Sequence, residues 1–412
     1  METTVIDLVT MNYTLTTNTT AVNINTSTPS QNHSDLLDVQ EFVEFEYYVR
    51  IIIPIIFGLI VALGLLGNLL VIVVILMNQQ MRSTTNILIL NLAIADLCFI
   101  IFCVPFTGTG YVLPQWPFGR IWCKIVQFLI YVCAYASVYT LVMMSLDRYL
   151  AVVHPIYSMS YRTQRNTVWI LLCLWGLILG GHTPLLFHND VIHYVYNGDP
   201  RSACVNKVTV NNNSAAKLFY GSFFACGYVL PLSLIVVLYG FMLKRLLYGV
   251  VPGGSQRAES IRSKKRVTKM VVIVVVIFAL CWLPIQIVFI IQNFGNFDEG
   301  VHSIAIQMVS NCLAYMNSCV NPILYAFLSD NFRRSFKKVL CCGYGHYTKF
   351  EYERTNIKIE KTEKTTVAQQ PSNNGTTMTP ASTGVSTTTL QTYYHNADSN
   401  RDTANHCTQT EV

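Results

Sequence analysis

One acidic side chain stands alone in a long apolar stretch of this sequence. Asp96 is the only Asp, Glu, Lys, Arg or His between residues 83 and 119. A carboxylate in apolar surroundings has to be protonated, hydrogen-bonded or paired with a cation. The polar side chains that other apolar stretches could bring beside it are Asn68, Ser137, Asn317, Ser318 and Asn321. Oxygen ligands of this kind suit a small hard cation such as sodium, while a polar network without an ion accounts for the same residues equally well.

A second charged group lies at the end of another apolar stretch, where Asp147, Arg148 and Tyr149 are consecutive. A charged side chain inside an apolar helix is costly and by default indicates a function. Adjacent opposite charges at a helix end are more commonly side chains that extend toward water. The residues alone leave both interpretations open.

Two prolines interrupt apolar stretches, Pro231 and Pro284. Each leaves a carbonyl one turn earlier without its donor and permits a kink. Trp282 lies two residues before Pro284, so a large aromatic side chain adjoins this bend. We expect this region to have two alternative arrangements.

The composition indicates which elements must position these residues. Of the 412 residues, 52% are hydrophobic and 12% are charged, whereas soluble domains carry about a quarter of charged residues. Seven stretches reach the ~20 residues that cross a bilayer as a helix: 48–76, 85–112, 120–152, 166–187, 217–247, 265–292 and 302–327. Backbone groups in lipid must bond locally, and these runs do not alternate as barrel strands do. The sequence predicts an all-α membrane protein, a seven-transmembrane helix bundle.

Positive charge predicts how this bundle lies in the membrane. No Lys or Arg precedes Arg50, and none lies in residues 293–301. The opposite side holds the basic residues Arg162, Arg165, Lys244, Arg245, Lys264, Lys265, Arg266, Arg333, Arg334, Lys337 and Lys338. The basic side is expected to be cytoplasmic. We therefore predict a multi-pass plasma-membrane protein with an extracellular N-terminus and a cytoplasmic C-terminus, and the net charge of +6 indicates topology and no nucleic-acid partner.

Cysteine positions divide into two groups. Most of the thirteen cysteines lie inside apolar stretches, where they serve as small buried hydrophobes. Cys123 and Cys204 lie at the predicted outer edge, in an oxidising compartment, and are expected to form a disulfide. Two free thiols are the alternative.

The chain ends have a different composition from the bundle. Residues 1–47 are rich in Thr, Asn and Ser and are predicted to be a disordered, glycosylated extracellular tail. Sequons that fall on the predicted outside are Asn12, Asn18, Asn25, Asn32 and Asn212. The bundle is expected over 48–328, and 343–412 is expected to be a disordered cytoplasmic tail. Its end, Thr410, Glu411 and Val412, could pair as a strand with a PDZ domain.

A short amphipathic helix is predicted over 329–342. Phe332, Phe336 and Leu340 recur every four residues with basic residues between them, a pattern of helices that lie on membrane lipid. Cys341 and Cys342 at its end are candidate palmitoylation sites.

Together these motifs, in their order and spacing, resemble the rhodopsin-like G-protein-coupled receptors over residues 48–342. The motifs that carry the resemblance are Gly67, Asn68, Asp96, Cys123, Asp147, Arg148, Tyr149, Trp175, Pro231, Tyr239, Phe278, Trp282, Pro284, Asn321, Pro322 and Tyr325. The resemblance implies a sodium pocket of Asp96, Ser137, Asn317 and Asn321 that favours the inactive state.

The same resemblance implies how the switch operates. Arg148 would leave Asp147 on activation and face the G protein, with Tyr239 and Tyr325 holding the active arrangement. Trp282 would change rotamer under the ligand, and the C-terminal tail would bind arrestin. Many relatives restrain this arginine with an acid at the base of helix six. Here that turn holds Lys264, Lys265 and Arg266, and Thr268 is expected as a weaker substitute.

The absence of two charged residues that other receptor classes use for their ligands narrows the class of ligand. Ile130 and Tyr315 occupy the positions where aminergic receptors carry an aspartate and opsins a lysine. The remaining expected ligand pocket is aromatic, amide or apolar: Tyr111, Gln127, Ile130, Tyr131, Gln286, Phe289 and Gln292. Amide side chains donate and accept, which suits a peptide backbone or a C-terminal amide. Acids on the outer side, Asp190 and Glu46 among them, would attract a basic peptide, or are solvated loop charges.

At finer grain, residues 111–119 and 134–142 look like those of arthropod allatostatin-A receptors, relatives of vertebrate galanin receptors. This resemblance implies an amidated peptide ending in Phe-Gly-Leu and coupling to the Gi/o class. The alternatives are a galanin-like or other peptide receptor and, from another class, a secondary transporter. We expect no enzyme, no catalytic residue and no metal apart from sodium at Asp96.

Overall fold

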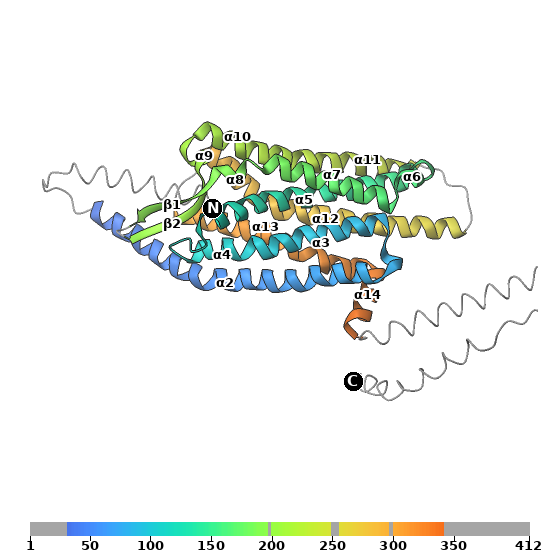
Figure 1. Ribbon diagram of the computed structural model, residues 1–412, viewed down its shortest axis with the longest axis horizontal. Coiled ribbons are helices and arrows are strands. Elements are labelled where there is room, and N and C mark those ends of the chain that lie inside the picture. Colours follow the sequence, from blue (N-terminus) through green and yellow to red (C-terminus); the bar gives the residue numbers. More distant parts are fainter. Residues whose placement is uncertain (1–30, 197–198, 249–254, 296–299, 342–412) are drawn as a thin grey trace, which may run out of the picture. The chain divides into compact units, whose positions relative to one another are not determined.

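The computed structural model describes residues 31–196, 199–248, 255–295 and 300–341 (Figure 1). The chain divides into two units, residues 1–347 and 348–412. The second unit lies outside the described residues, and so do the sequons before residue 31, Cys342 and the C-terminal residues 410–412. All the helices and strands given below belong to the first unit.

Seven long helical segments run antiparallel through this unit (Figure 1). In chain order they are α2 (Gln31–Met77), α3 with α4 (Thr84–Phe102, Val104–Val112), α5 (Gly119–Val153), α7 with α8 (Gln164–His182, Leu185–His188), α10 with η2 and α11 (Asn213–Phe224, Ala225–Val229, Leu230–Tyr248), α12 (Ser255–Phe294) and α13 (Val301–Leu328). The remaining elements are η1 (Gln79–Met81), α6 (Pro155–Tyr161), β1 (Asn189–Tyr196), β2 (Asp199–Asn206), α9 (Lys207–Asn211) and α14 (Asp330–Cys341).

Six of these segments are long and apolar enough to cross a membrane, by length and composition alone. The seventh, α13, has 28 residues, and its buried face is unusually polar, with Gln307, Ser310, Asn311, Asn317 and Asn321. Polar side chains of membrane helices face the bundle interior, which explains the lower hydropathy of α13. The all-α, seven-transmembrane architecture predicted from the sequence is the observed one.

Two boundaries differ from the prediction. The first helix begins at Gln31, inside the stretch expected to be irregular up to residue 47, because no glycine or proline interrupts residues 31–53. The second span is broken at Cys103, where α3 ends and α4 begins. Pro105 lies in the first turn of α4, where its missing N–H is tolerated, and it cannot donate to the preceding turn of α3.

The two prolines predicted to permit kinks lie in different local structure: a π-helical turn precedes Pro231, whereas α12 continues unbroken through Pro284. Pro231 follows a π-helical turn, Ala225–Val229, and the carbonyl of Cys226 in that turn accepts from the Tyr139 hydroxyl at 3.0 Å. Near Pro284 the carbonyl of Ala279 accepts from Tyr228 at 2.9 Å. Both tyrosines lie on neighbouring helical segments. In both helices a carbonyl near the proline therefore accepts a hydrogen bond from a tyrosine of another segment, which satisfies a backbone group that lipid could not.

One end of the bundle carries a β-hairpin and is called the disulfide end. Strands β1 and β2 pair antiparallel with Val191 opposite Cys204, and Cys204 forms a disulfide with Cys123 of α5, with Cα atoms 5.5 Å apart. The other end carries α6, η1 and α14 and is called the α14 end. There Phe332 and Phe336 of α14 are buried, and Phe332 stacks on Tyr325 of α13.

Candidate functional site

The consecutive Asp147 and Arg148 lie at the α14 end of α5, and both side chains are buried. The Nε of Arg148 donates to Oδ2 of Asp147 at 3.2 Å, and its Nη2 donates to the same oxygen and to Thr85. The Tyr149 side chain is not part of this pair, and its hydroxyl lies 3.2 Å from Nε2 of His154. The guanidinium is therefore held against its own neighbour.

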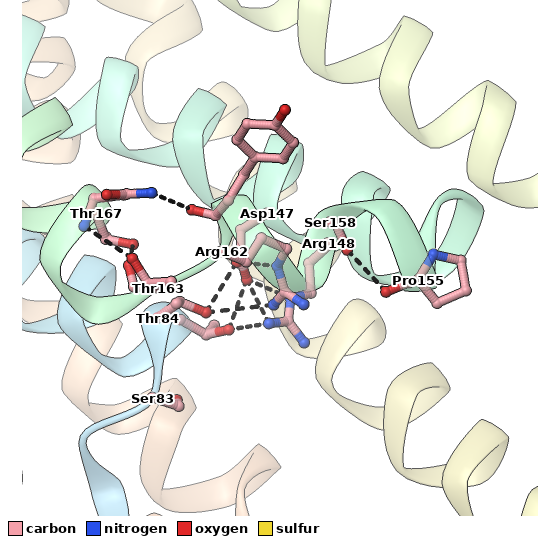
Figure 2. A network of polar contacts seen from close by, with 12 residues as sticks. Ser83, Thr84, Asp147, Arg148, Pro155, Ser158, Arg162, Thr163 and Thr167 are labelled. Carbon is pink, nitrogen blue, oxygen red and sulfur yellow. Dashed lines mark hydrogen bonds and ion pairs between the residues drawn. The ribbon is translucent and has the colours of Figure 1, made fainter.

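Asp147 has further partners from two other elements (Figure 2). Thr85 donates to Oδ2 at 2.7 Å and Thr84 donates to Oδ1 at 3.1 Å, both from the first turn of α3. Arg162, which follows α6, donates its Nε to Oδ1 at 2.8 Å. Both carboxylate oxygens thus have several donors, as a buried charge needs.

No hydrogen bond or ion pair of the described residues joins α12 to Arg148. The hydroxyl of Thr268, expected to substitute for an acid at the base of helix six, is buried and has no hydrogen-bond partner in the described part of the chain, so that expectation is wrong. Arg266 instead pairs with Asp330, the first residue of α14. This guanidinium and that of Arg333 lower the pKa of Asp330 to about 2.

Two tyrosine hydroxyls near this site are also buried, that of Tyr239 in α11, which lies beside Ser145, and that of Tyr325 in α13, which has no hydrogen bond among the described residues. Unpaired buried hydroxyls are costly and uncommon. Both side chains could gain a partner if the helices moved.

The isolated carboxylate of Asp96 is fully buried in the interior of the bundle. Asn321 donates to Oδ2 at 2.8 Å, Ser137 donates to Oδ1 at 3.4 Å, and Ser318 adjoins the same group. Among the described residues no cation pairs with Asp96. The hydroxyl oxygens of Ser137 and Ser318 and the amide of Asn321 surround the carboxylate, and such an oxygen-rich set fits a small hard cation.

The other two residues predicted for this network, Asn68 and Asn317, do not contact the Asp96 carboxylate directly. Asn68 of α2 donates to the carbonyl of Ser318 at 2.9 Å and to that of Gly64 in its own helix at 3.0 Å. Asn317 is buried, and no hydrogen bond of the described residues joins it to Asp96. Asn68 therefore supports the α13 backbone beside Asp96 without touching the carboxylate.

A cavity opens between Asp96 and the disulfide end. Its lining residues are Thr107, Gln127, Ile130, Tyr131, Tyr220, Phe223, Trp282, Ile285, Phe289, Asn311, Ala314 and Tyr315. Trp282 forms part of its wall, with Phe278 5.8 Å away between ring centroids. Four of the predicted pocket residues, Gln127, Ile130, Tyr131 and Phe289, thus meet here, beside Trp282, which lies two residues before Pro284 of α12.

Three predicted pocket residues lie elsewhere. Tyr111 lines a second, outer hollow at the disulfide end, and its hydroxyl accepts from the amide of Asn311 at 2.7 Å. Gln286 is fully buried, and Gln292 donates to Gln307 at 2.9 Å. Neither Gln286 nor Gln292 lines either cavity: the Gln286 side chain is buried, and the partly buried Gln292 is hydrogen-bonded to Gln307.

Two of the acids expected to attract a basic peptide, Asp190 and Glu46, already have cationic partners. Asp190 accepts from Lys207 at 2.6 Å and from Arg120 at 2.7 Å. Burial raises the pKa of Asp190, but these donors outweigh burial and hold it below its usual range. Glu46 pairs with Arg201 at 2.8 Å and with Arg50 at 3.4 Å. The described part of the disulfide end therefore offers less free negative charge than the sequence indicated.

Three of the polar groups around Asp147 carry no functional signal in the sequence. Thr84 and Thr85 follow the cap residue Ser83 at the start of α3, a position that signals only a helix start. Arg162 is one basic residue among many in the sequence, and only the fold of α6 brings it to Asp147.

The family motif Trp175 also has a polar partner in the fold. Its indole N–H donates to Asn91 at 2.8 Å, and Asn91 donates to Thr140 at the same distance. This chain of hydrogen bonds joins α7, α3 and α5.

Comparison with known proteins gives consistent matches. Residues 67–325 match the family described as 7 transmembrane receptor (rhodopsin family). The chain is 52% identical over 298 residues to the Allatostatin-A receptor of Bombyx mori, covering 72% of this chain and 81% of that receptor. It is 37% identical over 361 residues to a galanin-like G-protein coupled receptor of Caenorhabditis elegans (80% and 84% covered). It is 38% identical over 328 residues to Galanin receptor type 1 of Homo sapiens (78% and 89% covered).

Proposed function

The chain belongs to the rhodopsin family of seven-transmembrane receptors, and from that premise we propose that its ligand is an allatostatin-A-type peptide ending in a Phe-Gly-Leu amide. The protein is a G-protein-coupled neuropeptide receptor of the plasma membrane and is no enzyme. The observation that carries the finer proposal is its 52% identity to the Allatostatin-A receptor of Bombyx mori, against 38% to human Galanin receptor type 1. The transporter alternative has no support in this family.

The inner cavity offers the groups that such a peptide end needs. Gln127 and Asn311 supply amides that both donate and accept, which matches a C-terminal carboxamide. Tyr131, Phe223 and Phe289 supply aromatic surface for the phenylalanine. No Asp, Glu, Lys or Arg stands among the described residues that line this cavity, so a neutral amide end suits it better than a free carboxylate.

The proposed orientation places the disulfide end outside the cell and the α14 end in the cytoplasm. Basic residues support it, because Arg333, Arg334, Lys337 and Lys338 are all exposed on α14. The N-terminus is then extracellular and the C-terminus cytoplasmic. We assign coupling to Gi/o on the same likeness to allatostatin-A receptors.

In the proposed mechanism, peptide binding moves Trp282 and with it the α14 end of α12. Arg148 then leaves Asp147 and contacts the G protein. The buried hydroxyls of Tyr239 and Tyr325 gain partners in the active arrangement. A sodium ion at Asp96, with Ser137, Ser318 and Asn321 as neighbours, would favour the inactive state by linking α3, α5 and α13.

Further partners are proposed from sequence positions. The tail 343–412 would bind arrestin, and Thr410, Glu411 and Val412 would bind a PDZ domain. Cys341 and Cys342 would carry palmitate that holds α14 at membrane lipid. Of the proposed glycosylation sites, Asn32 lies in the first turn of α2, and Asn212 is exposed at the start of α10.

The deciding experiment is a peptide-response assay in cells that express the full chain. An allatostatin-A peptide, the same peptide with a free carboxylate end, and galanin are applied in parallel. Nucleotide exchange is measured with and without Gi/o blockade. A response to the amidated peptide that Gi/o blockade removes supports the proposal. A response to galanin alone overturns the ligand, and a response that persists under blockade overturns the coupling.

A further inference from the structure

Asp147 holds two guanidinium groups at once, one on each carboxylate oxygen. Arg148 bonds to Oδ2 from the next position of α5, and Arg162 bonds to Oδ1 at 2.8 Å from beyond α6 (Figure 2). We infer that Arg162 is a positioning residue of the switch, which keeps Asp147 paired when Arg148 leaves. This inference rests on the proposed function, in which Arg148 is the group that is released.

The free-energy argument concerns Asp147 after that release. Its side chain is 7% exposed, and a buried carboxylate that loses its cation is strongly disfavoured. With Arg162 in place, Oδ1 keeps Arg162 and Thr84, while Oδ2 keeps Thr85. The carboxylate therefore remains paired with one cation in the active state.

The two guanidinium groups also act on each other. Arg148 and Arg162 carry like charges and contact the same carboxylate, so each weakens the hold of the other. Without Arg162, Arg148 would be the only cation paired with Asp147. Arg162 should therefore favour the released state twice, by repelling Arg148 before release and by pairing with Asp147 afterwards.

The backbone around Arg162 is fixed on both sides. Its own N–H donates to the carbonyl of Ser158 at 2.8 Å, which ends α6. The next residue, Thr163, caps α7 by accepting from the backbone N–H of Asn166 at 3.2 Å. Arg162 Nη2 also donates to Thr84 at 3.3 Å. The side chain is thus directed toward Asp147 by the connection between α6 and α7.

This role predicts an unusual direction of effect. If Arg162 merely strengthened the inactive arrangement, its removal would raise basal activity. If it replaces Arg148 as the partner of Asp147, its removal should lower basal activity and agonist potency, because only the active state would lose its last cation. We expect a fall of about tenfold in potency, the size of one lost hydrogen bond to a charged group.

The experiment compares Arg162→Gln, Asp147→Asn and the double variant in the full-length receptor. Arg165→Gln is the matched control, since Arg165 is exposed three residues further on. One readout needs no ligand: spin-label distances between the α14 ends of α7 and α12 give the fraction of receptor with α12 displaced. The second is peptide-stimulated nucleotide exchange.

Arg162→Gln should reduce the displaced fraction and the potency, and Arg165→Gln should change neither. In the Asp147→Asn background, Arg162→Gln should have no further effect, because the carboxylate that it serves is absent. A larger displaced fraction in Arg162→Gln, an unchanged one, or an equal effect in both backgrounds overturns the inference. If the native receptor answers to no tested peptide, the proposed ligand fails, while the ligand-free distances still decide the role of Arg162.

Discussion

The side-chain amide of Asn321 donates a 2.8 Å hydrogen bond to Oδ2 of Asp96. This bond joins α13 to α3 in the middle of the bundle, one residue before the proline in α13. The hydrogen bond from Ser137 of α5 to the other carboxylate oxygen is longer, at 3.4 Å. A ligand at Asp96 would therefore respond to the arrangement of three helices.

We predict that Asp96→Asn removes the effect of sodium on agonist affinity. The amide keeps the size of the side chain and loses the charge that a cation needs. Agonist affinity is measured in sodium and in an equal concentration of a bulky organic cation. The native receptor should bind agonist several-fold more weakly in sodium, by about the factor typical of coupled sites. A sodium effect that persists in the variant contradicts the pocket.

A second prediction concerns the contact of α2 with α13. A Cβ atom at Gly67 would lie 2.9 Å from Cβ of Pro322, whereas one at Gly58 on the same helix would meet nothing within 4 Å. Gly67→Ala should destabilise the receptor by about 1–3 kcal/mol through overpacking. Gly58→Ala should be neutral or slightly stabilising, since alanine favours helix. Thermal unfolding of the two purified variants tests this difference, and equal midpoints would refute the close approach.

The residues whose surroundings could be predicted from the sequence are those under a strong local physical constraint. A lone acid in an apolar helix must find polar partners, and polar residues of other spans meet Asp96 in the fold. Prediction is poorer where the contacts of a side chain depend on which face of its helix it lies on. Gln127 and Gln292 look alike in the sequence, yet one lines the cavity and the other bonds to Gln307, because the period alone does not fix how a helix is rotated in its bundle.

The connection after α5 could not be predicted at all. The contact between Arg162 and Asp147 depends on the short helix α6 and on the cap of α7, and neither follows from hydrophobic periodicity. The start of the first helix differs from its prediction for another reason. A polar composition indicates disorder up to residue 47, but the absence of glycine and proline permits helix from Gln31.

A third prediction is that Arg148→Ala abolishes signalling while peptide binding survives. Arg148 lies at the α14 end, far along α5 from the cavity residues Gln127 and Tyr131, so it cannot contact the peptide. Stimulated nucleotide exchange should fall by about a hundredfold, the upper range of coupling between sites. Saturation binding of a labelled peptide without G protein should be unchanged. Normal exchange by the variant would remove Arg148 from the switch.

A fourth prediction separates the amide that lines the cavity from a partly buried amide on α12 that lies outside it. Gln127→Ala should lower the potency of an amidated peptide by about tenfold, through the loss of a hydrogen bond to the ligand. Gln292→Ala should leave potency unchanged within about twofold, because Gln292 bonds to Gln307. Surface expression is measured for both. Equal losses of potency would show that the cavity is wrongly placed.

The last prediction concerns Arg266 and Asp330, which pair between α12 and α14. Among the described residues no acid at the base of α12 restrains Arg148, and this pair joins α12, the helix that moves in the proposed mechanism, to α14. Asp330→Asn should therefore raise basal nucleotide exchange, by up to about fivefold for an exposed pair. Arg333 also bonds to Asp330, but within α14, so Arg333→Gln is the matched control and should leave basal exchange unchanged.

The pH dependence of basal exchange tests the same pair. The pKa of Asp330 is lowered from 3.8 to about 2. The ion pair therefore stabilises the folded state fully above the unfolded pKa of 3.8, and this effect is lost only as the pH falls through the folded pKa of about 2. Basal activity should then not respond to this pair between about pH 6 and 8. Exchanging the two charges, with Arg266→Asp and Asp330→Arg together, should restore the native level. A failure of Arg266→Gln to match Asp330→Asn would show that the pair does not restrain α12.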